Sequence, residues 1–140
     1  MVDFNKLKNI FKKYPYITCA YLFGSYATGK KSALSDVDIA VLLNKNAPKG
    51  RKLIHNLDYL SYQIACCLKV KEVDVIELNT KGPVFVHNVL KTGKLIYDAN
   101  PSERIKFVTK IISYYCDFQP QINFMNKYYF DGYRRRLQSI

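Results

Sequence analysis

Apolar residues in the first half of the chain follow two different spacings. Residues 4–14 place an apolar side chain every three or four positions with lysines between them, which predicts an amphipathic helix that stops at Pro15. Two continuous apolar runs follow at 17–23 and 37–43, and such runs are typical of buried strands. Leucine and isoleucine then recur at helical spacing over 51–69. We therefore expect helix, strand, strand and helix in that order.

The second half continues the alternation of strands and helices. A third apolar strand is expected at 73–78. A short helix should lie between Pro83 and Gly93, because proline is favoured at the first helical position and glycine just after the last. Residues 94–97 predict a short strand suited to a sheet edge. These elements predict an α/β (α+β) fold, with a small mixed sheet of three to four strands flanked by helices.

The C-terminal region predicts helix. Asn100 followed by Glu103 three residues later has the spacing of a capping box at a helix start. Helical spacing then reaches Pro120, which should break or kink the helix, and resumes beyond it. We therefore expect a helical tail over about 101–138, attached to a single domain that spans 1–140.

Length and composition exclude several classes of protein. With 140 residues, 49% hydrophobic and 24% charged, the chain has the composition of one globular domain. No apolar run approaches the roughly 20 residues of a membrane span, and the first residues lack a signal-peptide pattern, so a cytoplasmic protein is expected. Its cysteines lack CxxC or Cys/His spacing, which favours buried thiols over disulfides or zinc. They are Cys19, Cys66, Cys67 and Cys116.

Basic residues outnumber acidic ones by two to one. Lys and Arg total 22 and Asp and Glu total 11, which gives a net charge of +11. This balance favours an anionic partner, such as a nucleotide, a nucleic acid or an acidic protein surface. Because acids are scarce, the few that lie on apolar strands are conspicuous.

Three aspartates occupy the beginnings of two predicted strands. Asp36 and Asp38 are two residues apart, so their carboxylates should project side by side from one face of a strand. Two neighbouring carboxylates repel each other, and Mg²⁺ bound with substrate phosphates is the usual compensating charge. Asp74 would join them if its strand is a neighbour, as a two-metal phosphoryl-transfer site requires. For an Asp-x-Asp pair alone, a solvated strand end is the commoner explanation.

A glycine–serine pair precedes the aspartates and strengthens the case for phosphate chemistry. Gly24 and Ser25 end a buried strand, where backbone N–H groups and a hydroxyl can approach a phosphate closely. Gly29, Lys30 and Lys31 follow as a basic rim. Gly-Ser alone ends many strands, so the evidence lies in its combination with the aspartates at this spacing.

These motifs resemble a known family. Gly24-Ser25-Tyr-Ala27-Thr-Gly29, followed by Ser35-Asp36-Val-Asp38, resembles the signature of DNA polymerase beta-type nucleotidyltransferases. Within that superfamily the chain is similar to the minimal nucleotidyltransferases (MNT), often antitoxins paired with HEPN-domain ribonuclease toxins. The likeness includes Val73-Asp74-Val-Ile-Glu-Leu-Asn79 and covers most of the chain.

The resemblance implies a polymerase beta-like fold, ATP as substrate and Mg²⁺ as cofactor. It implies that Asp36 and Asp38 bind the metal, that Asp74 joins this set and helps to activate the acceptor hydroxyl, and that Gly24 and Ser25 hold the triphosphate. Relatives often carry arginine where this chain has Tyr26 and Thr28. Lys30 or Lys31 would then have to neutralise the phosphates.

The length of the chain limits the acceptor of the nucleotide. Only about forty residues follow Asn100, too few for a second substrate-binding domain. The acceptor is therefore small or presented by another protein, and the resemblance implies a tyrosine hydroxyl of a HEPN toxin that receives AMP. Three alternatives stay open: transfer to a small molecule such as an aminoglycoside, nucleotide addition to RNA ends, or toxin binding without catalysis. The net charge permits direct nucleic-acid binding, but no RNA-stacking motif favours it.

The tail itself could be a docking surface. It holds more tyrosine and apolar residues than a helix pair can bury against a small sheet, and it ends in Arg134-Arg135-Arg136. Aromatic anchors with arginines at the rim are common at protein interfaces. The alternative is that the tail covers the sheet and that the arginines form a solvated helix end.

Overall fold

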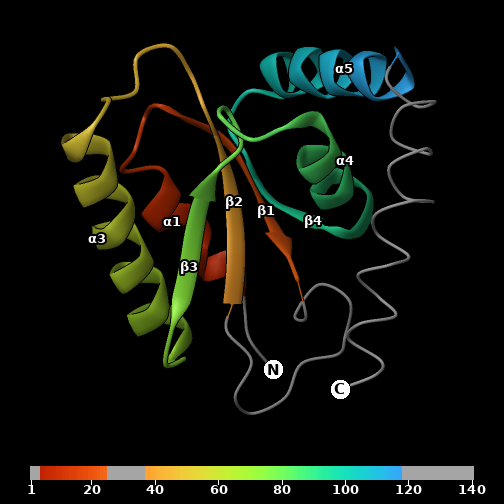
Figure 1. Ribbon diagram of the computed structural model, residues 1–140. Helices are drawn as coiled ribbons and strands as arrows, with labels where there is room; N and C mark the ends of the chain where they lie inside the picture. Colours follow the sequence, from red (N-terminus) through yellow and green to blue (C-terminus); the bar gives the residue numbers. More distant parts are fainter. Residues whose placement is uncertain (1–3, 25–36, 118–140) are drawn as a thin grey trace, which may run out of the picture.

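Four strands form one mixed sheet in the order β3-β2-β1-β4 (Figure 1). The computed structural model describes residues 4–24 and 37–117. The strand β1 runs antiparallel to β2 and β4, whereas β2 and β3 are parallel and are joined by a helical crossover. The strands are β1 Ile17–Phe23, β2 Val37–Leu43, β3 Val73–Glu77 and β4 Lys94–Asp98.

Helices cover both faces of this sheet (Figure 1). One face packs against α1 and α3 and the other against α4 and α5, which makes a three-layer domain. In the described residues the helices are the 3-10 turn η1 Phe4–Lys6, α1 Leu7–Phe11, α3 Arg51–Leu68, α4 Pro83–Thr92 and α5 Pro101–Asp117. None of the helices in the described ranges has the length and apolarity needed to cross a membrane. The predicted class, a mixed sheet of up to four strands with flanking helices, is confirmed.

Alternation along β2 divides the core into two parts. Val37, Ile39 and Val41 point toward α1 and α3, where Leu60 and Ile64 of α3 complete a fully buried cluster. Ala40 and Leu42 point the other way, toward α4 and α5. Because successive strand residues alternate between faces, an apolar run without polar breaks indicates burial on both sides, as predicted.

Most predicted elements are confirmed, and their bounds differ little. The strand at 17–23 is observed as predicted, and the helix expected at 51–69 covers 51–68. The first helix is shorter than the expected 4–14, because it begins as a 3-10 turn and ends at Phe11. Pro120 and most of the predicted tail lie outside the described residues.

The expectation of buried thiols is wrong for two of the four cysteines. Cys19 is fully buried in the sheet, but Cys66 on α3 and Cys116 on α5 are exposed. Each exposed cysteine lies on the outer side of an amphipathic helix. The absence of CxxC spacing argues against a disulfide or a zinc site, but it does not predict whether a cysteine faces the core or the solvent.

Gly93 ends α4 as predicted, but for a different reason. Its φ of −83° is ordinary, so no left-handed turn requires glycine there. A Cβ at this position would lie 2.5 Å from the carbonyl oxygen of Val89 and 3.0 Å from that of Leu22. Glycine is therefore required because a side chain here would meet the last turn of α4 and, next, β1.

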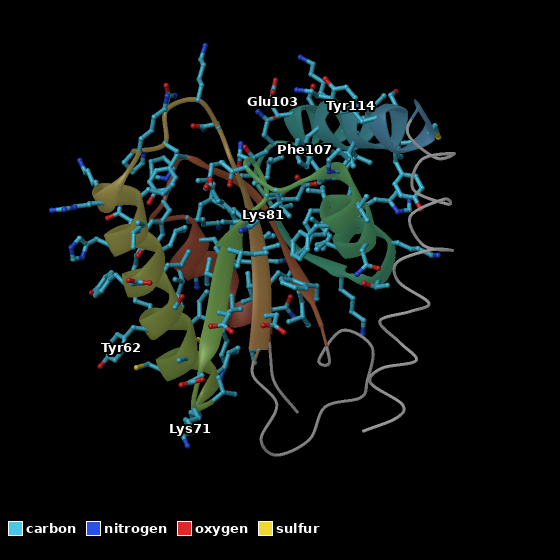
Figure 2. All side chains as sticks on the ribbon, in the orientation of Figure 1. Tyr62, Lys71, Lys81, Glu103, Phe107 and Tyr114 are labelled. Carbon is cyan, nitrogen blue, oxygen red and sulfur yellow. The ribbon has the colours of Figure 1, made fainter. Side chains whose placement is uncertain are left out.

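The start of α5 has the asparagine half of the predicted capping box. The Asn100 Oδ1 accepts a hydrogen bond from the Glu103 N–H at 3.2 Å. The Glu103 carboxylate lies 3.4 Å from Lys106 Nζ. Figure 2 shows Glu103, Phe107 and Tyr114 along α5, and Phe107 packs against the sheet while Tyr114 is exposed. The first part of the predicted tail is therefore a structural layer of the domain.

A partly buried ion pair joins α5 to β4 beside two buried side chains of β1. The Arg104 Nε donates to Asp98 Oδ2 at 2.9 Å, next to Cys19 and Tyr21 of β1. Burial is the main reason that the pKa of the Cys19 thiol rises to about 12 and the pKa of Tyr21 also rises to about 12. Both groups are therefore strongly held in their neutral forms.

We expect the free energy of unfolding to fall as pH rises above about 9. Both pKa values are raised in the folded state. The stability that the two neutral groups contribute is therefore complete below their unfolded pKa values, 9.0 for Cys19 and 10.0 for Tyr21, and is lost as the pH rises toward 12. Each group should lower stability by about 1.4 kcal/mol per pH unit in its own window. Urea unfolding at pH 8 to 11 measures this decline.

In the Cys19→Ala variant, the decline should begin near pH 10 instead of pH 9. The matched control is Cys116→Ala, which removes an exposed thiol on α5 and should keep the onset of the decline near pH 9. An unaltered profile in Cys19→Ala would contradict the assignment of the pH 9 onset to the buried thiol.

Candidate active site

Asp38 and Asp74 lie side by side at one end of the sheet. In the parallel pairing of β2 with β3, Asp38 is directly opposite Asp74. Neighbouring strands are about 4.8 Å apart, and paired residues project from the same face. The condition set by the sequence, that the strand of Asp74 must neighbour that of Asp38, is therefore confirmed.

The sheet register explains why this pair can meet a ligand. Asp38 shares the face of Ala40 and Leu42, which α4 and α5 cover farther along the strand. Asp38 itself is partly buried and Asp74 is exposed, so the carboxylates lie at the margin of the core. The Val37 N–H donates to the Glu72 carbonyl at 3.3 Å and fastens the beginnings of the two strands.

Gly24 packs directly against the Asp38 carboxylate. It follows the last residue of β1, Phe23, which pairs with Asp38 across the antiparallel ladder. Its φ is +75°, and a Cβ there would lie 3.3 Å from Asp38 Cγ and closer still to Oδ2. Both conditions require glycine. The glycine of the predicted phosphate loop and the aspartate of the predicted metal site therefore pack against each other.

Part of the predicted site lies outside the described residues. Ser25, Lys30, Lys31 and Asp36 all fall within 25–36, so their roles stay predictions. Within residues 4–24 and 37–117, no group of three or more His, Cys, Asp or Glu side chains is placed to hold a metal ion. Asp38 and Asp74 are the two predicted metal ligands that the structure places together.

An aromatic wall beside the carboxylates was not predicted. Phe85 of α4 makes an edge-to-face contact with Phe23, with ring centroids 6.1 Å apart. Farther along, His87 stacks on Tyr115 of α5 at 3.7 Å with the rings nearly parallel. The sequence does contain a pattern that indicates exposed apolar residues here, because 83–92 carries apolar residues on more than one side of the helix. Which of them are exposed depends on the packing of the whole domain.

A separate cavity lies at the other end of β2. It has a volume of about 520 Å³ and is bounded by residues 42–46 and by the first turns of α5. Lys45, Lys106 and Lys110 line it, together with Glu103. No predicted catalytic residue lies there, so this cavity is not part of the carboxylate site.

Comparison with known families and proteins identifies clear relatives. Residues 5–102 match the family model described as "Polymerase beta, Nucleotidyltransferase". The protein adenylyltransferase MntA of Aphanizomenon flos-aquae is 33% identical over 106 residues, which cover 71% of this chain and 69% of the relative.

Solved structures show the same fold. A toxin–antitoxin crystal structure with AMP-PNP superposes with a TM-score of 0.68 at 26% identity, covering 88% of this chain and 94% of the other. A complex of an MNT antitoxin with the tri-AMPylated HEPN toxin of Shewanella oneidensis gives a TM-score of 0.62 at 24% identity, covering 89% and 97%. The second likeness supports the fold alone.

Proposed function

Because the chain belongs to the polymerase beta nucleotidyltransferase family, and within it to the minimal nucleotidyltransferases that include MntA, we propose that it is an antitoxin that AMPylates a HEPN-domain ribonuclease toxin. The acceptor is a tyrosine hydroxyl of the toxin, and the donor is ATP. The observation that carries the proposal is the pairing of Asp38 with Asp74 beside Gly24.

The reaction is a displacement at phosphorus. The tyrosine oxygen attacks the α-phosphorus of ATP, a new P–O bond forms, and the bond from the α-phosphorus to the bridging oxygen breaks. Pyrophosphate leaves and AMP remains on the toxin. Asp74, which is exposed at the margin of the sheet, accepts the proton of the attacking hydroxyl. The site contributes mainly by positioning the reactants and balancing charge.

The chemistry of the side chains fits Mg²⁺. Carboxylate oxygens are hard ligands, and two of them lie on adjacent strands at the same level. Asp36, Asp38 and Asp74 would hold the metal, which when bound offsets the negative charge of the phosphates. Gly24 and Ser25 would contact the triphosphate through backbone N–H groups and a hydroxyl, with Lys30 or Lys31 supplying positive charge.

The direct test mixes the purified protein with ATP, Mg²⁺ and its toxin. We expect the mass of the toxin to increase by one or more AMP groups while its ribonuclease activity is lost. A toxin in which the acceptor tyrosine is replaced by phenylalanine should stay unmodified and active. Neutralisation of that variant, or neutralisation without any gain of mass, would favour the alternative of toxin binding without catalysis.

We also propose that residues 1–140 form a single domain whose last residues dock on the toxin. Ile111 of α5 is buried in the core, so a truncation must begin after this helix. Deleting residues 121–140, including Arg134, Arg135 and Arg136, should leave the fold and ATP binding intact and reduce toxin modification at least about tenfold. Circular dichroism, calorimetry with an ATP analogue and the modification assay measure the three properties. Unchanged modification would contradict docking by the tail, and so would loss of the fold.

A further inference from the structure

A groove on the outer side of α4 leads away from the carboxylate site. The α4 groove is a cavity of about 600 Å³, within the size range of ligand sites. Its lining includes Val84, Phe85, His87, Asn88 and Lys91 of α4 and Tyr115 of α5. We propose that the α4 groove binds the segment of the acceptor protein that carries the target hydroxyl, an inference that rests on the proposed function.

The groove has the composition of a surface that binds a polypeptide. Val84 and Phe85 are 49% and 40% exposed, although both are large apolar side chains. No acidic residue lies on α4, and Lys91 is its only charged side chain. The stacked rings of His87 and Tyr115 join α4 to α5 and form a flat wall. Aromatic and apolar anchors with a few polar groups at their edge are typical of protein interfaces.

The position of the groove links it to the reacting groups. Phe85 contacts Phe23, which is the cross-strand partner of Asp38. Side chains of directly opposed residues have Cβ atoms about 5 Å apart. The side chain of Phe23 therefore separates the start of the groove from Asp38, a proposed metal ligand. The groove lies on the sheet face from which Asp38 projects.

The length of the groove favours a peptide over the adenine base. Val84 and Lys91 are seven residues apart on α4, which corresponds to about 10 Å along the helix axis. This length matches about three residues of extended polypeptide. A nucleobase would occupy only the end near Phe85 and leave the remaining wall uncovered, whereas a peptide covers it.

The experiment places a charge in the groove and measures its effects on acceptor and nucleotide separately. Val84→Glu should raise the KM for the toxin at least about tenfold in the AMP-transfer assay. Its affinity for a non-hydrolysable ATP analogue, measured by calorimetry without toxin, should stay within about twofold of the parent. The matched control is Ile105→Glu, because Ile105 is an equally exposed apolar residue on α5 outside the groove.

Each other outcome overturns the proposal. An unchanged KM would show that the acceptor binds elsewhere, and an equal loss of ATP affinity would assign the groove to the nucleobase. A lowered melting temperature together with faster proteolysis after residue 117 would assign it to this chain's own C-terminal segment. Should Val84→Glu fail to fold, Asn88→Arg serves as the second variant, because Asn88 is exposed and lines the groove.

Failure of the groove can be distinguished from failure of the proposed function. If the parent protein transfers no AMP to the toxin, the proposed function fails. The affinity of each variant for the unmodified toxin then still reports on the groove. We expect Val84→Glu to weaken that binding at least about tenfold and Ile105→Glu to leave it unchanged.

Discussion

Asp38→Asn is expected to lower the rate of AMP transfer at least about 1,000-fold without unfolding the protein. Losing one carboxylate would remove a proposed metal ligand, an effect of several kcal/mol on the transition state. The fold should tolerate the change, because the amide has nearly the same shape and the strand keeps its buried neighbours Val37 and Ile39. Asp36→Asn should have the same effect on transfer. Labelled ATP and purified toxin give the rate, and circular dichroism tests the fold.

The control for this prediction is Asp58→Asn. Asp58 is an exposed aspartate on α3, in the layer on the opposite face of the sheet from Asp38. The control removes the same charge from the same protein and should transfer AMP at the parent rate. Undiminished transfer by Asp38→Asn would refute the proposed catalytic role of this carboxylate.

Gly24→Val is expected to weaken ATP binding and to destabilise the fold. A side chain at this position meets the Asp38 carboxylate and must also adopt a φ of +75°. The conformational strain alone costs about 1–2 kcal/mol, and more for a branched side chain. Displacement of the Asp38 carboxylate should lower affinity for the nucleotide at least about tenfold. Calorimetry with an ATP analogue and urea unfolding measure the two effects.

Variants of two other glycines separate the effect of a positive φ from the effect of the contact with Asp38. Gly50 has a φ of +66° and open space around its Cβ position, so Gly50→Ala should show the conformational cost without any change in ATP binding. Gly82 has an ordinary φ of −68° and the same open space, so Gly82→Ala should be nearly neutral in both assays. Gly24→Ala should lose both stability and affinity. Equal ATP affinity in Gly24→Ala and the parent would place the phosphates elsewhere.

The strands were predictable because their sequence pattern depends on burial alone. The apolar run over 17–23 ends at Gly24, and the observed strand has the same limits. The first helix was less predictable, since apolar spacing continues to Tyr14 although the helix ends at Phe11. Tyr14 still packs inward, and its hydroxyl donates to Gln63 Oε1 at 2.6 Å. Periodicity therefore identified the buried side chains better than the helix end.

The site was predictable only in part, because sequence does not give strand order. Asp74 was a candidate only if β3 pairs with β2, and that pairing depends on how α3 crosses the sheet. Phe85 was not a candidate at all, since its contact with Phe23 depends on the position of α4. The roles of Ser25, Lys30, Lys31 and Asp36 rest on the motif and stay predictions.

The parallel crossover also determines when the site can form during folding. Asp38 and Asp74 are 36 residues apart in the chain and meet only after α3 has packed and β3 has joined the sheet. Closing the loop between such distant strands costs conformational entropy before any favourable contact forms. Non-local pairings of this kind therefore tend to form late. Moreover, within the part of the chain that the structure describes, β3 lies at the sheet edge and pairs with β2 alone, and weakly held elements are often among the first to open in local unfolding. Catalytic activity should therefore appear last on refolding and disappear first on unfolding, while β1 and β2 are still paired.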